Sequence, residues 1–96
     1  MARYRIVHWR EIPSVVEALD GERVVRLLLS QRFQDLIDAV AMRSGASDSE
    51  AYLDGWGQTA EAEHPGDVDE VAGQVAAKLE AEFQDIVARH LAAPSR

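Results

Sequence analysis

The segment SVVEALDGERVVRLLL, residues 14–29, contains two runs rich in valine and leucine that flank the dipeptide Asp20-Gly21. Asp-Gly suits the two central positions of a type I′ turn, because both positions need a positive φ. Valine on both sides favours strands. We therefore predict a β-hairpin in which strand 14–19 turns at this dipeptide and returns as strand 22–29.

The predicted loop sets the pairing of this hairpin, with Val16 opposite Val25 and Ser14 opposite Leu27. Because successive side chains of a strand point to opposite faces, one face becomes apolar and the other mixed. The apolar face collects Val16, Ala18, Val25 and Leu27, and the other places Glu17, Glu22 and Arg26 beside Val15, Val24 and Leu28. This patterning is typical of an antiparallel sheet with helices packed on one face.

A further strand precedes the hairpin. Residues 3–9 alternate in character, and one side of the predicted strand carries Tyr4, Ile6 and His8. Pro13 lacks an amide hydrogen and favours extended geometry in the residue before it. Residues 10–13 are therefore predicted to form the corner between the first two strands.

Two helices are predicted after the hairpin. Ser30 is a candidate N-cap for a helix that ends at Gly45 in a left-handed conformation. Its apolar stripe consists of Phe33, Leu36, Ile37, Val40 and Ala41. Ser47-x-x-Glu50 has the pattern of a capping box that opens a second, short helix. Residues 58–64 alternate weakly and are a candidate edge strand.

A long C-terminal helix is predicted after Asp67-x-x-Glu70, a second capping box. Its apolar stripe extends from residue 68 to residue 91, which is about 24 residues and about 36 Å of helix. A compact chain of this length has a radius of gyration of about 13 Å. A helix of the predicted length is too long for such a domain, so its last turns are expected to project beyond the sheet. They would leave four apolar residues to be covered by another surface, namely Phe83, Ile86, Val87 and Leu91.

Together these elements predict a single domain over residues 1–96. The fold class is α+β, with a three- to four-stranded antiparallel sheet, helices packed on one face and a long C-terminal helix.

Composition narrows the classes of function. The net charge is −7, and residues 1–48 hold seven basic and seven acidic side chains against three and ten in residues 49–96. An acidic surface repels a phosphate backbone, so no nucleic-acid partner is expected. The chain has no apolar run long enough to span a bilayer and no secretory leader pattern, so we expect a cytoplasmic protein that binds no membrane. Zero cysteines exclude disulfides and thiolate chemistry.

No motif for catalysis or cofactor binding is found. Glycine-rich phosphate loops and Gly-x-Ser-x-Gly elbows are absent, and His64 among acidic residues lacks the ligand spacing of a zinc site. We therefore expect no catalytic residue, no metal and no cofactor.

Two classes of function remain open. Tryptophan, tyrosine and arginine are enriched at interface hot spots, which favours a protein-interaction module, or a homo-oligomer, that binds through the C-terminal helix. Its predicted interface comprises Trp9, Arg10, Tyr52, Trp56, Phe83, Ile86, Val87 and Leu91. The alternative is a small ligand-binding protein or enzyme with a pocket on the open face of the sheet, formed by His8, Arg10, Glu17 and Arg26.

Four segments resemble a known family. RYRIVHWREIP (3–13), QRFQDLIDAVAM (31–42), AYLDGW (51–56) and DEVAGQVAAKLEAEF (69–83) are similar to the small bacterial family called virulence factor. The resemblance covers about residues 3 to 83 and supplies no catalytic residue. It implies an accessory subunit that works with a one-carbon or methyl-transfer enzyme, so that a folate- or corrinoid-dependent enzyme is the expected partner.

Overall fold

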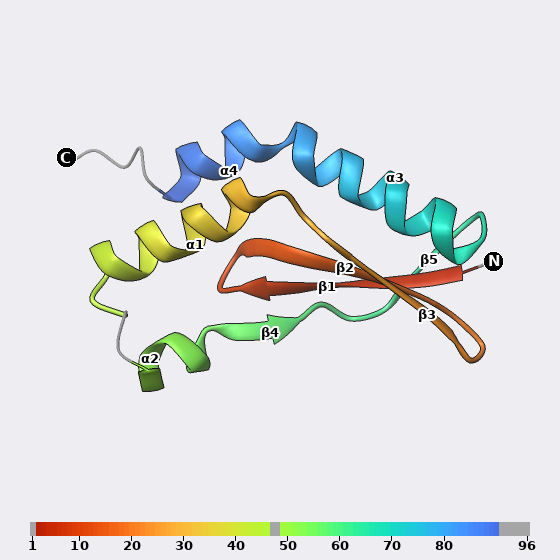
Figure 1. The fold of residues 1–96 in the computed structure, drawn as a ribbon, viewed down its shortest axis with the longest axis horizontal. Helices are drawn as coiled ribbons and strands as arrows, with labels where there is room; N and C mark the ends of the chain where they lie inside the picture. Colours follow the sequence, from red (N-terminus) through yellow and green to blue (C-terminus); the bar gives the residue numbers. More distant parts are fainter. Residues whose placement is uncertain (1, 47–48, 91–96) are drawn as a thin grey trace.

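The computed structural model of this chain, which describes residues 2–46 and 49–90, contains an antiparallel sheet of five strands (Figure 1). The strands are β1 Ala2–Trp9, β2 Ile12–Asp20, β3 Arg23–Leu28, β4 Trp56–Gln58 and β5 Ala62–His64. Their order is β3-β2-β1-β4, and β5 pairs with the other end of β1 on the same side as β4. β3 therefore forms one edge of the sheet.

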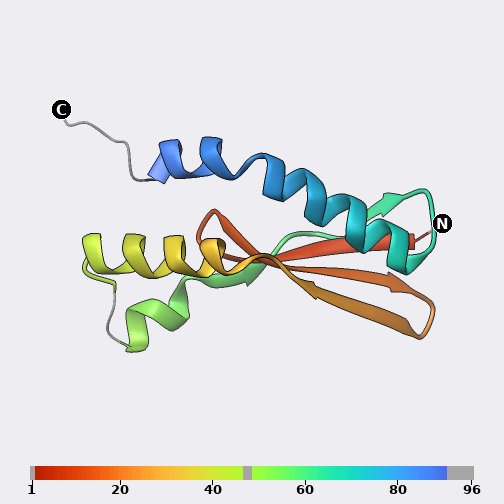
Figure 2. The same cartoon turned by 45° about the horizontal axis from the view of Figure 1, so that its top comes forward.

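Four helices are found in the described ranges, namely α1 Gln31–Arg43, α2 Ser49–Asp54, α3 Val68–Ala81 and α4 Phe83–His90. α3 lies across one face of the sheet, against β1, β2 and β3, and α4 continues past it to pack on α1 (Figures 1 and 2). The predicted α+β class and antiparallel sheet are confirmed. The sheet has more strands than expected, because the predicted edge strand 58–64 is replaced by two short strands, β4, which ends at Gln58, and β5. No helix in these ranges is long and apolar enough to cross a membrane.

The predicted pairing of β2 with β3 is wrong by two residues. Val16 lies opposite Leu27 and Ala18 opposite Val25, so the loop consists of Gly21 and Glu22. Gly21 has a φ of 61°, whereas Glu22 is not among the described residues with positive φ, which a type I′ turn would require. Glycine at the first central position alone fits a type II′ turn instead. A shift of two leaves every side chain on its predicted face.

The corner between β1 and β2 is tighter than predicted. Arg10 adopts a φ of 52° and its amide donates to the carbonyl of Gly55 at 2.7 Å, so the chain reverses over Arg10 and Glu11. Pro13 consequently lies inside β2, opposite His8. A strand tolerates this proline because the register shifts beside it, between Val7 and His8, where a β-bulge disrupts the ladder.

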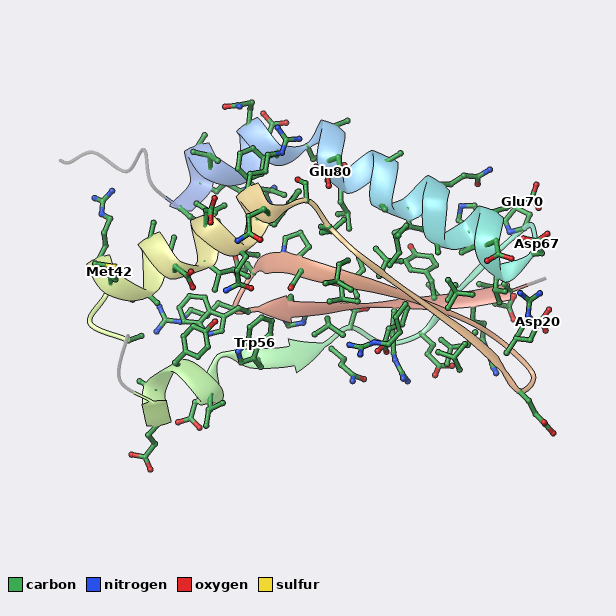
Figure 3. The ribbon with its side chains drawn as sticks, in the orientation of Figure 1. Asp20, Met42, Trp56, Asp67, Glu70 and Glu80 are labelled. Atoms are coloured by element: carbon green, nitrogen blue, oxygen red, sulfur yellow. The ribbon has the colours of Figure 1, made fainter. Side chains whose placement is uncertain are left out.

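The predicted long C-terminal helix is two helices that meet at Glu82. No proline or glycine marks this break. α3 begins with the predicted capping box, in which the side chain of Asp67 accepts from the amide of Glu70 and the side chain of Glu70 accepts from the amide of Asp67 (Figure 3). After the break, α4 turns towards α1, and the Phe83 ring packs edge-to-face on Phe33 with centroids 4.9 Å apart.

The start of α1 is held by a residue of α3. Ser30 occupies the N-cap position, but its side chain does not cap the helix. Its hydroxyl and its amide instead donate to the carboxylate of Glu80 at 2.8 and 2.7 Å, and Arg32 donates to the same group (Figure 3). Burial raises the pKa of Glu80, but these hydrogen bonds outweigh it and hold the pKa below its usual value. Gly45 ends the helix with a φ of 77°, as predicted, whereas Ser47 lies outside the described residues.

Candidate functional site

Trp9, the first residue of the predicted interface, belongs to the interior. Its side chain is 0% exposed, its Nε1 donates to the carbonyl of Tyr52 at 2.7 Å, and its ring stacks on that of Tyr52. A Cβ on Gly55 would lie 2.5 Å from Nε1, so glycine is what allows the chain to pass this close. Another protein cannot contact Trp9 while this arrangement holds.

The other aromatic residues of that group form the wall around Trp9. Tyr52 and Trp56 are half-buried and pack edge-to-face, and the hydroxyl of Tyr52 accepts from Gln34. Arg10 is exposed, and its guanidinium lies 4.6 Å from the centre of the Trp9 ring. The structure therefore brings these residues together mainly as a core element, with Arg10 as its exposed member.

The apolar residues of α4 are largely covered by this chain itself. Ile86 is 3% exposed, and Phe83 and Val87 are half-buried against the core that includes α1. The expectation that these turns project uncovered is therefore wrong for Ile86. Leu91 lies outside the described residues.

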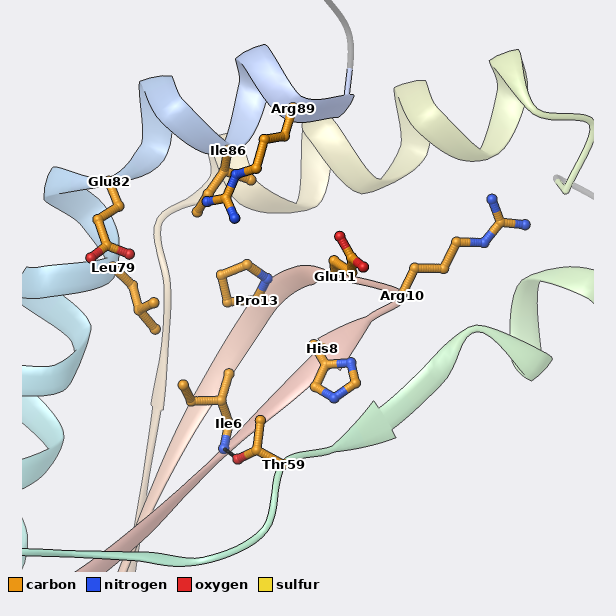
Figure 4. Close-up of a pocket in the computed structure, with 10 residues that line it drawn as sticks. All are labelled: Ile6, His8, Arg10, Glu11, Pro13, Thr59, Leu79, Glu82, Ile86 and Arg89. Carbon is orange, nitrogen blue, oxygen red and sulfur yellow. Dashed lines mark hydrogen bonds between the residues drawn. The ribbon is translucent and has the colours of Figure 1, made fainter. Parts of the chain in front are cut away.

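The four residues of the predicted ligand pocket are separated by the sheet. His8 and Arg10 line a cavity of about 380 Å³ on the helical side (Figure 4). Glu17 and Arg26 lie in the row of side chains on the opposite, open face. The cavity lining also includes Ile6, Glu11, Pro13, Thr59, Leu79, Glu82, Ile86 and Arg89. Sequence reasoning missed Glu82 and Arg89. The single helix that it predicted would have placed both on one face, seven residues apart, whereas Glu82 lies at the junction of α3 and α4.

A charge network occupies the open face. Arg5, Glu17 and Arg26 lie directly opposite one another on β1, β2 and β3. Arg5 Nε is 2.6 Å from Glu17 Oε1, and Arg26 Nε is 2.8 Å from Glu17 Oε2. The hydrogen bond from Arg5, opposed by burial and aided by both guanidinium charges, holds the pKa of Glu17 below its usual value.

Beside this network, the edge strand β3 exposes large apolar side chains. Val24 is 53% exposed and Leu28 is 72% exposed, and both share the open face with Arg26. Leu27, on the helical side of the same strand, is 38% exposed. An edge strand with exposed apolar side chains is a template for pairing with another chain. The sequence pattern places these residues on the mixed face but does not show that they lie at an edge.

Comparison with known proteins identifies one family. The model of the family described as Virulence factor matches residues 7–91, which is most of the 96-residue chain. The chain belongs to the Virulence factor family. No curated protein and no solved structure matches it.

The matched range of this Virulence factor domain includes the β3 edge and the whole lining of the cavity beneath α4 except Ile6. Within residues 2–46 and 49–90, no three His, Asp or Glu side chains are grouped so that they could hold a metal ion.

Proposed function

We propose that this Virulence factor domain is a non-catalytic protein-interaction module that binds a strand of another protein along the β3 edge. The observation that carries the proposal is the exposure of Val24 and Leu28 on a strand that has a neighbour on one side only. Burial of large apolar side chains supplies the main driving force for association.

The backbone of β3 also offers hydrogen-bonding groups. In an antiparallel ladder, residues alternate between pointing their N–H and C=O groups towards the neighbour and away from it. Leu29 N donates to Ser14 O, so by alternation the groups of Val25 and Leu27 point to β2. Those of Val24, Arg26 and Leu28 point outward, where a partner strand would pair with them.

Charge favours an acidic partner strand over a second copy of this chain. The described part of β3 carries Arg23 and Arg26 and no acidic residue. Two copies of β3 paired antiparallel through these outward groups, with Val24 opposite Leu28, would place Arg26 opposite Arg26. Like charges directly opposite each other destabilise a pair. A strand that carries an apolar, an acidic and an apolar residue at positions i, i+2 and i+4, on one face, would instead match Val24, Arg26 and Leu28.

The partner class comes from the family resemblance. A folate- or corrinoid-dependent enzyme of one-carbon or methyl-transfer chemistry is the partner we propose first, with this domain as its accessory subunit. The C-terminal helix, the predicted surface, would then contribute only its exposed residues, because Ile86 is already buried.

Affinity capture from native cells with a matched pair of variants tests the proposal. Leu28→Asp places a charge on β3, where Leu28 is 72% exposed. Met42→Asp places the same charge at the end of α1, where Met42 is 73% exposed (Figure 3). We expect one protein to be captured by the wild type and by Met42→Asp but not by Leu28→Asp. Equal capture by all three proteins would show that the β3 edge is not the binding surface. A solution mass twice that of the chain would show that the partner is a second copy of this chain and not an acidic strand of another protein.

A further inference from the structure

The cavity beneath α4 has an apolar floor and a charged rim. Ile6, Pro13, Leu79 and Ile86 provide the floor, and Glu11, Glu82 and Arg89 provide charged groups around it (Figure 4). Its volume of about 380 Å³ is near the lower limit of small-molecule sites. The space therefore suits a compact ligand with an apolar body.

The charged groups of this rim form no ion pair within residues 2–46 and 49–90. Arg89 donates through Nε to the carbonyl of Asp85 but pairs with no described carboxylate. Glu82 and Glu11 likewise pair with no described basic side chain. Five other arginines, at positions 3, 5, 23, 26 and 32, do form ion pairs with described carboxylates. The cavity rim therefore offers charges of both signs to a ligand.

The charges of Glu82 and Arg89 suit a ligand that carries both signs. Glu82 lies at the junction of α3 and α4, and Arg89 lies in the last turn of α4. Both side chains point down from the helix towards the cavity (Figure 4). Arg10 also lines the cavity, but its guanidinium donates to Ser44 and lies over the Trp9 ring. A simple anion would be attracted by Arg89 but repelled by Glu82 and Glu11, so a ligand with an anionic and a cationic group fits better.

His8 also lines the cavity. Its Nδ1 is buried and has no hydrogen-bond partner among the described residues. A buried polar nitrogen without a partner costs about 1–3 kcal/mol, which a ligand that hydrogen-bonds this ring would offset.

We propose that this cavity binds a small zwitterion with an apolar body, of the class of apolar α-amino acids. The carboxylate would accept from the Arg89 guanidinium, and the ammonium group would donate to the carboxylate of Glu82. The apolar side chain would lie on Ile6 and Leu79. This site lies on the helical side of the sheet, separate from the open face that carries Val24 and Leu28.

Calorimetric titration of the full chain with L-leucine tests this site. We expect saturable binding that weakens about ten-fold or more in Arg89→Gln and in Glu82→Gln, because each loses a charge-assisted hydrogen bond. Arg3→Gln, an exposed arginine that pairs with Glu61, is the control and should bind as the wild type does. N-acetyl-L-leucine and L-leucine amide each lack one of the two charges. The wild type should bind each of them no more tightly than the two variants bind L-leucine.

Two results would overturn the proposal. One is the absence of any heat of binding for L-leucine, L-valine and L-phenylalanine at millimolar concentrations. The other is binding of N-acetyl-L-leucine as tight as that of L-leucine, because Glu82 would then have no role. Thermal unfolding of each variant, with a melting temperature like that of the wild type, shows that the fold is retained, and neither result bears on the β3 edge.

Discussion

Arg26 Nε lies 2.8 Å from Glu17 Oε2, and this ion pair joins the edge strand β3 to the centre of the sheet. Glu17 is buried at 7% exposure and also accepts from Arg5, so one carboxylate holds three strands together across the open face. The guanidinium of Arg26 is thereby fixed on the same face as Val24 and Leu28. The surface that we propose for partner binding is consequently joined to the ion-pair network of Arg5, Glu17 and Arg26.

Two glutamates, Glu17 and Glu80, make the stability of the fold depend on pH. The pKa of Glu17 and that of Glu80 are lowered by folding, so both groups bind protons less readily in the folded state than in the unfolded chain. Their contribution is fully present above the ordinary glutamate value of 4.5 and is lost as the pH falls through the lower, folded values. Urea unfolding between pH 7 and pH 3 should show this loss. Glu17→Gln should lose less stability over that range than the wild type, and an equal loss would show that Glu17 does not contribute.

Glu80 should be needed for the start of α1. Glu80→Gln removes the charge that accepts from Ser30 and Arg32, and we expect the free energy of unfolding to fall by about 1–3 kcal/mol. Asp69→Asn is the control, because the pair that it disrupts with Arg23 is exposed on both sides and should contribute less than about 1 kcal/mol. Urea unfolding at pH 7 measures both, and equal losses would contradict the special role of Glu80.

Two glycines should respond in opposite directions to alanine. Gly55→Ala would place a Cβ 2.5 Å from Nε1 of the buried Trp9, and we expect a loss of about 1–3 kcal/mol. Gly73 lies exposed within α3 with nothing near its Cβ position, so Gly73→Ala should gain about 0.5–1 kcal/mol. Thermal unfolding monitored by circular dichroism distinguishes the two, and a Gly55→Ala protein as stable as the wild type would contradict the packing of Trp9.

The apolar residues of α4 and those of β3 should differ in how much they contribute to the free energy of unfolding. Ile86→Ala should lower the free energy of unfolding by about 2–5 kcal/mol, since it leaves a cavity in the core. Leu28→Ala should change it by no more than about 0.5 kcal/mol, because Leu28 is exposed. If both substitutions proved neutral in urea unfolding, Ile86 would be free for binding, as the sequence pattern suggests.

The faces of the hairpin are predictable from sequence, because alternation with a period of two survives an error of two residues in the loop. The loop itself is not predictable, since Asp20-Gly21 and Gly21-Glu22 both place the glycine in the turn and the same side chains on each face. The choice between them depends on which turn type the sheet accommodates.

Features that depend on distant contacts escape the sequence. Nothing local marks Glu82 as the end of α3; the break allows Phe83 to reach Phe33, fifty residues earlier in the chain. The sequence likewise predicts Trp9 as an interface residue, because the residue that covers it, Tyr52, is remote in sequence. The candidate pocket was half predicted, because His8 and Arg10 do line a cavity while the sheet separates them from Glu17.

Site-specific photo-cross-linking in native cells tests the β3 edge most directly. A p-benzoylphenylalanine in place of Leu28 should yield one cross-linked partner, whereas the same group in place of Met42, equally exposed at the end of α1, should yield none of that product. A product at position 28 that is no stronger than at position 42, or that consists of two copies of this chain, would contradict the proposal that β3 binds a strand of another protein.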